Sequence, residues 1–122
     1  MEANELRIGN YATDSIQTGA ITVFNNDACV LKHKSGIVKC RISDLSPVPL
    51  TEEWLLKFGF ENFEDNNSLY QKDLLTISIC GNIFIEQSED KYVFFRNKIH
   101  SIHQLQNLYF ALTGEELTSK SE

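Results

Sequence analysis

Four of the five lysine and arginine side chains in residues 1–50 form a single cluster that could bind negatively charged groups. Its members are Lys32, Lys34, Lys39 and Arg41. In a hairpin over residues 28–42, each strand would place its two cations on one face of the sheet. If both pairs lie on the same face, they form a stripe of four cations. Such a stripe can meet phosphates or an acidic peptide. The alternative is the solvent face of a half-buried sheet, on which lysine discourages pairing at sheet edges.

Aromatic side chains supply a second candidate surface, because they are concentrated after residue 50 and exceed what one small face can bury. Neighbouring rings in a strand point to opposite faces, so some rings must lie outside a one-sided core. Burial between two halves of the molecule would absorb this surplus, whereas an exposed apolar patch would mark a protein partner or a homodimer. The candidates for such a partner surface are Trp54, Phe60, Phe63, Phe95 and Phe110.

Cysteine and histidine give little indication of catalysis or metal binding. Cys29, Cys40 and Cys80 lack the CxxC spacing of a zinc site, and their odd number does not fit a disulfide framework. We interpret them as small apolar side chains in a reducing compartment. His100 and His103 are three residues apart, but His100 precedes the expected start of a helix. We therefore expect no metal and no cofactor.

Carboxylates and glycines also lack the patterns that enzymes use. The acidic clusters fall at a helix start or in polar loops, where burial cannot separate the pKa values of paired carboxyl groups. The sequence has no glycine-rich phosphate loop, no GxSxG and no HExxH. We predict that the protein is not an enzyme.

Composition narrows the partners further. The chain has 122 residues, of which 42% are hydrophobic and 23% are charged, and its formal net charge is −6. Residues 1–50 are neutral overall, so the whole excess of acid lies in residues 51–122. This charge disfavours broad binding to nucleic acid or to an anionic membrane. Because no apolar run reaches the ~20 residues of a membrane span and no secretory signal opens the sequence, we expect a cytoplasmic protein.

The first half reads as short strands separated by turn residues. Four strands at intervals of roughly 8–12 residues indicate a small barrel or a strongly bent sheet, and we expect an SH3-like barrel. A single helical turn over residues 43–47 would close it. The expected strands are residues 6–11, 20–24, 29–34 and 37–42.

The second half reads as helix, antiparallel meander and helix. Thr51 can cap a short helix that ends before Gly59. A polar loop over residues 61–67 follows. Ser101 and Gln104 have the spacing of a capping box for a helix that ends at Gly114. The expected meander strands are residues 69–71, 74–79, 83–86 and 92–95.

Runs of strands that do not alternate one for one with helices predict an α+β fold. The shift in charge and the Pro47-Val48-Pro49 segment predict a boundary near residue 50. We expect an SH3-like β subdomain at residues 1–49, a helix–meander–helix subdomain at residues 50–117 and a flexible tail at residues 118–122. Whether the two halves share one core remains open at this stage.

Three stretches carry a resemblance to a known family. They are ANELRIGN at residues 3–10, PVPLTEEWLLKFGF at residues 47–60 and HQLQNLYFALTGEEL at residues 103–117. In this order they resemble a family of small uncharacterised proteins of gut anaerobes and their prophages or other mobile elements. The resemblance spans nearly the whole chain and implies an accessory protein of a mobile element. It implies no activity, cofactor or site residue.

We conclude from the sequence that a non-enzymatic module for protein interaction is the leading hypothesis, with a protein partner or self-association through the aromatic surface. The alternative is a nucleic-acid-associated accessory protein that uses the basic cluster on the N-terminal barrel.

Overall fold

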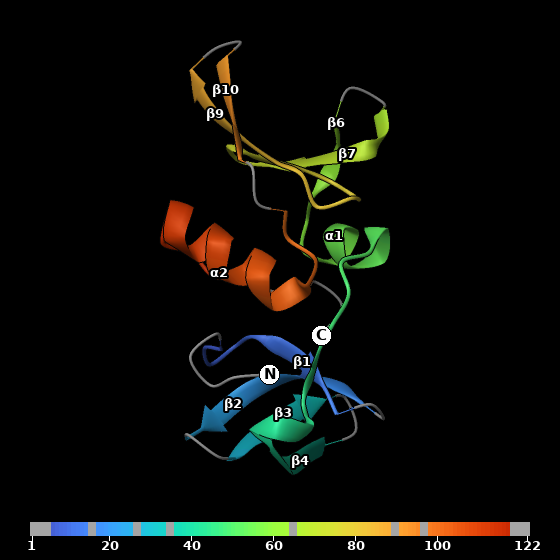
Figure 1. The fold of residues 1–122 in the computed structure, drawn as a ribbon, viewed down its shortest axis with the longest axis vertical. Helices are drawn as coiled ribbons and strands as arrows, with labels where there is room; N and C mark the ends of the chain where they lie inside the picture. Colours follow the sequence, from blue (N-terminus) through green and yellow to red (C-terminus); the bar gives the residue numbers. More distant parts are fainter. Residues whose placement is uncertain are drawn as a thin grey trace. The chain divides into compact units, whose positions relative to one another are not determined.

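The computed structural model describes residues 6–14, 17–25, 28–33, 36–63, 66–88, 91–95 and 98–117. It is a small α+β protein with two five-stranded antiparallel sheets and two α-helices (Figure 1). Contacts divide the chain into two compact units. Unit 1 comprises residues 1–49 and 101–116, and unit 2 comprises residues 50–100 and 117–122. The first division falls where the composition changes, but the C-terminal helix belongs to unit 1, whereas the sequence pattern grouped it with the meander.

Sheet 1 belongs to unit 1 and has the strand order β4-β3-β2-β1-β5. A single 3-10 turn, η2 (Ile42–Asp44), links β4 to β5 close to the expected helical turn. After it the chain returns to pair β5 with β1. No closed barrel forms among the described strands. The strands are β1 (Tyr11–Thr13), β2 (Thr18–Phe24), β3 (Ala28–His33), β4 (Gly36–Arg41) and β5 (Ser46–Pro47).

The expected strand over residues 6–11 is wrong for most of its length, because residues 7–10 form a turn. The Asn10 N–H donates to the Arg7 carbonyl at 3.0 Å, and the Arg7 N–H donates to Asn10 Oδ1 at 2.6 Å. Gly9 has φ +96°, a left-handed conformation that glycine adopts readily. Ile8 is 60% exposed, so the alternation of Leu6 and Ile8 does not mark a buried face.

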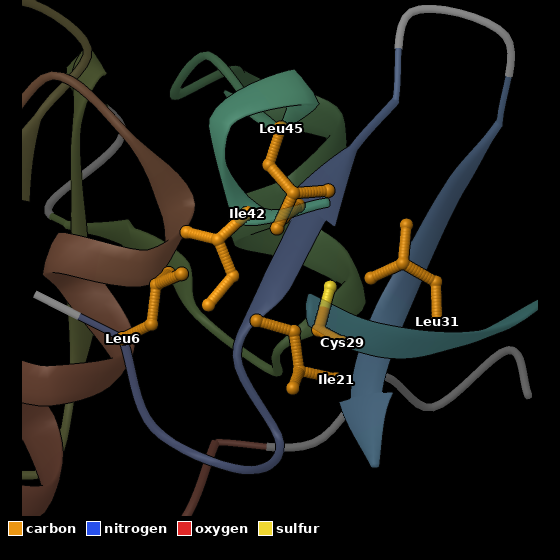
Figure 2. Close-up of a cluster of buried hydrophobic side chains, with 7 residues drawn as sticks. Leu6, Ile21, Cys29, Leu31, Ile42 and Leu45 are labelled. Carbon is orange, nitrogen blue, oxygen red and sulfur yellow. The ribbon is translucent and has the colours of Figure 1, made fainter. Parts of the chain in front are cut away.

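The core of unit 1 is an aliphatic cluster on the inner face of sheet 1 (Figure 2). Ile21 and Leu31 lie opposite each other on β2 and β3, and both are fully buried. Ile42 and Leu45 reach the cluster from η2 and the residue that follows it. The members are Leu6, Ala12, Ile21, Cys29, Leu31, Ile42 and Leu45.

Helix α2 (Ile102–Thr113) is attached to the first residues of unit 1 by buried polar contacts. Gln106 is 3% exposed; its Nε2 donates to the Gly9 carbonyl at 2.9 Å, and its Oε1 accepts from the Tyr11 N–H at 2.8 Å. Asn107 Oδ1 accepts from Arg7 Nε at 2.7 Å and from Asn10 Nδ2 at 3.0 Å. These contacts join residues almost one hundred positions apart.

The ends of α2 follow the sequence prediction only in part. Ser101 is the N-cap and Gly114, with φ +76°, is the C-cap, as expected. The predicted capping box is wrong, because the Ser101 hydroxyl makes no capping hydrogen bond and instead pairs with His103 Nδ1 at 3.1 Å. His103 is 3% exposed, and this contact anchors it beside the start of the helix.

Unit 2 contains helix α1 (Glu52–Lys57) and sheet 2, a meander with the strand order β10-β9-β8-β7-β6. Thr51 caps α1 by accepting from the Trp54 N–H at 3.4 Å, and Gly59 follows the helix with φ +92°, as the sequence predicts. The expected loop over residues 61–67 is wrong in part, because β6 and the start of β7 lie there. The strands are β6 (Glu61–Phe63), β7 (Asn66–Lys72), β8 (Leu75–Ser78), β9 (Ile83–Ser88) and β10 (Lys91–Phe95).

Sheet 2 has one strongly apolar face. Leu75 and Ile77 on β8 are fully buried, and Ile83 on the neighbouring β9 lies directly opposite Ile77. Lys72 donates from Nζ to the Phe58 carbonyl at 2.7 Å, which ties β7 to the end of α1. None of the helices in the described residues is long and apolar enough to cross a membrane.

Candidate functional site

The most distinctive exposed surface of unit 1 is the outer face of sheet 1, the face opposite the core cluster. Directly opposed residues in antiparallel strands project to the same side of a sheet. On β3 and β4 the opposed pairs Lys32–Ile37, Val30–Lys39 and Ala28–Arg41 therefore share a face, and Val23 of β2 joins it opposite Val30. The paired residues of β2, β3 and β4 on the outer face are Ala20, Val23, Ala28, Val30, Lys32, Ile37, Lys39 and Arg41.

Exposure confirms which side of sheet 1 faces away from the core. Along β4, Ile37, Lys39 and Arg41 are exposed, whereas the intervening Val38 and Cys40 are half-buried against the core cluster. Lys32 on β3 is also exposed, next to the fully buried Leu31. The alternation of period two follows from the pleat of the strands.

The outer face combines three cations with exposed aliphatic side chains. Ile37 is 73% exposed and Val23 is 62% exposed, values that few large apolar side chains reach in a folded unit. Burial of apolar surface is favourable by about 25 cal/mol for each Å² removed from water, and an exposed side chain does not gain this free energy. A ligand that covers these two side chains would recover part of that free energy, while the cations select its charge.

Two shallow hollows run along this part of sheet 1. One, of about 160 Å³, is lined by Val23, Asn25, Ala28, Cys29, Val30 and Lys39. The other, of about 440 Å³, is lined by Ala28, Lys39, Cys40, Arg41 and Ser43. Ala28 and Lys39 line both, so the two hollows adjoin. The small side chain of Ala28 lies opposite Arg41 and leaves room beside two charged groups.

The structure therefore brings together three of the four predicted basic residues. Lys32, Lys39 and Arg41 are exposed on one face, and Lys34 lies outside the described residues. The exposed aliphatic members of this face, Val23 and Ile37, were not predicted from the sequence. The position of Ile37 on this face could have been predicted from the hairpin, because the register that aligns residues 28 and 41 also places Ile37 opposite Lys32.

The five aromatic residues predicted as a partner surface do not gather in one unit. Phe60 is only 2% exposed, so the prediction that it forms part of an exposed surface is wrong. Trp54 is half-buried, and its ring centre lies 5.6 Å from that of Phe58, with the two ring planes tilted by 43°. Lys57 Nζ lies 5.0 Å from the Trp54 ring centre. Phe110 is 41% exposed but belongs to unit 1.

Arginine covers the Phe110 ring. The Arg7 guanidinium lies 4.5 Å from the ring centre and also bonds Glu116 at 2.7 Å. The side chains of Phe63 and Phe95, the last two predicted members, lie outside the described residues. An exposed ring that the sequence analysis did not select is Phe94, which is 57% exposed and lies 5.1 Å from the Phe84 ring on the neighbouring strand.

Among the described residues, no three histidine, cysteine, aspartate or glutamate side chains converge where they could hold a metal ion. The geometry thus consists of a charged and aliphatic face with two hollows. Comparison with protein-family models, with curated proteins and with solved structures finds no match to this chain.

Proposed function

We propose that this protein is a non-enzymatic interaction module whose outer face of sheet 1 binds an acidic, aliphatic segment of a protein partner. The observation that carries the proposal is the presence of Lys32, Lys39 and Arg41 on the same face as the exposed Val23 and Ile37. Carboxylates pair with the cations, and aliphatic side chains of the partner cover Val23 and Ile37.

The position of β4 favours an extended segment. β4 ends the strand order of sheet 1, so its outer edge can accept an added strand. Alternate side chains of such a strand would lie beside Ile37, Lys39 and Arg41. Two copies of β4 would bring lysine and arginine close together, which disfavours self-pairing, whereas an acidic strand is attracted. The charge thus supports a partner other than a second β4.

The proposal extends to fold and origin. An SH3-like arrangement for unit 1 is supported by the strand order and by η2, which precedes the return of β5 to β1. The resemblance of the three sequence motifs supports an accessory role in a mobile element. The three free thiols support a reducing compartment, such as the cytoplasm.

A second candidate is a nucleic-acid-associated accessory protein. The convergence of Lys32, Lys39 and Arg41 on one face favours it, because those side chains could contact consecutive phosphates. Two features weigh against it. The chain carries a net charge of −6, and among the described residues the aromatic ring that the register places on this side of sheet 1, Tyr11 opposite Ala20, is buried and offers a base no surface for stacking.

Fluorescence polarisation with defined probes tests the proposal. The probes are a labelled peptide of alternating glutamate and valine, its lysine–valine counterpart, and single-stranded and duplex DNA. We expect the acidic peptide to bind preferentially. The triple variant Lys32→Gln, Lys39→Gln, Arg41→Gln should weaken its binding about tenfold, the sum of three partly screened charge contacts.

Matched single variants separate a local effect from a change in total charge. Lys39→Gln and Lys98→Gln each remove one exposed cation, but only Lys39 lies on the outer face. We expect a two- to threefold loss for Lys39→Gln and no loss for Lys98→Gln. Equal effects of the two variants would contradict the proposal. Preferential binding of DNA, with a logarithmic salt dependence of about −2 to −3 for three phosphates, would favour the second candidate.

A further inference from the structure

Two cysteines lie directly opposite each other in sheet 1. Cys29 of β3 pairs in register with Cys40 of β4, and their Sγ atoms are 3.5 Å apart. Both side chains project to the inner side, opposite Lys39 and Arg41, because neighbouring residues of a strand alternate. A disulfide needs an Sγ–Sγ distance of about 2.05 Å, so side-chain rotation with a small approach of the strands would join them.

The two thiols differ in their access to solvent. Cys29 is 2% exposed and lies within the aliphatic core cluster, where Figure 2 shows its sulfur among Ile21, Ile42 and Leu45. Cys40 is half-buried on β4, the strand that ends the sheet. A small polar reagent would therefore reach Cys40 first.

The environment of Cys29 also indicates that Cys40 reacts before Cys29. Burial, reinforced by the hydrogen bond and the charge interaction with Cys40, raises the pKa of the Cys29 thiol to about 12. Cys29 therefore stays protonated at neutral pH. The thiolate is the form that reacts with oxidants, so Cys29 is not the thiol that a peroxide oxidises first.

We propose that Cys29 and Cys40 form a reversible redox pair, which a peroxide converts into a cross-strand disulfide. In the first step, the Cys40 sulfur attacks one peroxide oxygen; the S–O bond forms, the O–O bond breaks, and the departing hydroxide takes the thiol proton as water. In the second step, the Cys29 sulfur attacks the sulfenic sulfur of Cys40; the S–S bond forms, the S–O bond breaks, and the hydroxide leaves as water with the Cys29 proton.

Electrons and atoms balance in this sequence. Two thiols and one hydrogen peroxide yield one disulfide and two waters, with one electron lost by each sulfur. A dithiol reductant restores both thiols by exchange and leaves as its own disulfide. The bond would fix β3 to β4 behind the outer face. It does not depend on the proposed ligand, so the two proposals can fail separately.

Cys80 provides an internal comparison, because it is exposed in unit 2. The experiment uses the full chain with Cys80→Ser, which prevents disulfides between molecules through that thiol. One equivalent of hydrogen peroxide is added at neutral pH, the remaining thiols are alkylated after unfolding, and an unreduced digest is analysed by mass spectrometry. We expect a peptide pair that joins Cys29 to Cys40, with the loss of two hydrogen atoms and reversal by dithiothreitol.

Two further measurements test whether the crosslink forms within the folded chain and requires Cys40. Thermal unfolding of the oxidised chain should occur at a higher temperature than that of the reduced chain, because the crosslink restricts the unfolded chain. Adding Cys40→Ser at the half-exposed position should abolish the crosslinked peptide while circular dichroism retains the native spectrum. Sulfinic or sulfonic acid on Cys40 with an alkylated Cys29, covalent dimers as the main product, or no reaction would overturn the proposal.

Discussion

Sheet 1 and sheet 2 each have five antiparallel strands, yet they are stabilised in different ways. Sheet 2 is a sequential meander from β6 to β10, so its neighbours in space are neighbours in sequence. Sheet 1 departs from this order when β5 returns to β1, and its unit also needs α2 from the far end of the chain. Unit 2 therefore forms mainly from local contacts, whereas unit 1 depends on distant ones.

The two sheets also differ on the face opposite the apolar core. The outer face of sheet 1 has cations beside exposed aliphatic side chains. On sheet 2, the row opposite the apolar face contains the Phe84–Phe94 pair and the buried Thr76, which lies opposite Phe84. Similar backbones thus present different chemistry, because side chains of alternate residues decide what each face can bind.

The largest effect that we expect is in unit 2, at Gly81. Gly81 has φ +92°, and a Cβ built on it would clash with the Ile99 carbonyl oxygen. Its N–H donates to the Ser78 carbonyl and its carbonyl accepts from the Ile99 N–H, so the backbone cannot simply shift away. Gly81→Ala should reduce the free energy of unfolding by roughly 3 kcal/mol or more, as measured by urea unfolding.

Gly9 in unit 1 is the matched control for this substitution. Its φ of +96° is nearly the same, but nothing lies within 4 Å of a Cβ built on it. Gly9→Ala should cost only about 1 kcal/mol, the conformational penalty of a left-handed alanine. If the two substitutions had equal costs, the close contact of Gly81 with Ile99 would have no energetic significance.

The second largest effect should be in unit 1, where a polar side chain fixes the returning helix. Gln106→Leu removes the donor to the Gly9 carbonyl and the acceptor of the Tyr11 N–H. Loss of two buried hydrogen bonds to backbone groups should cost about 2–3 kcal/mol in urea unfolding. Ala111→Leu on the exposed side of the same helix should change stability by less than about 0.5 kcal/mol. Similar costs for both would show that α2 is held by other contacts.

How much the sequence could predict depends on the range of the interactions. Helix α1 was predictable because Thr51, Lys57 and Gly59 act on the turn next to them. The attachment of α2 was not, since nothing near Gln106 indicates that its partners are Gly9 and Tyr11. The alternating apolar residues at 6–10 wrongly predicted a strand, because a side-chain hydrogen bond and a left-handed glycine form a turn there.

For the candidate site, too, the features set by local spacing were predictable from the sequence and the others were not. A hairpin centred on residues 34–35 aligns Lys32 with Ile37 and Cys29 with Cys40, so its face and its thiol pair are implicit in the spacing. The exposure of Val23 was not predictable. A shift in register between Ile21 and Val23 places Val23, rather than Thr22, opposite Val30. A bulge of this kind changes which side chains share a face without a clear signal in the local sequence.

The smallest effect on stability that we expect comes from a substitution in the Phe84–Phe94 pair of sheet 2, which also tests whether the ligand binds there or on the outer face of sheet 1. Phe94→Ala in sheet 2 removes a 57% exposed ring whose centre lies 5.1 Å from that of Phe84, so unfolding should become easier by about 1 kcal/mol. Binding of the glutamate–valine peptide should remain unchanged in this variant, whereas Ile37→Asn in sheet 1 should weaken it several-fold. The control for Ile37 is Ile8→Asn, because Ile8 is a 60% exposed isoleucine of unit 1 that is not among the paired residues of the outer face. If Phe94→Ala abolished peptide binding and Ile37→Asn did not, the ligand face would belong to unit 2, and the aromatic surplus of the second half would be the functional surface.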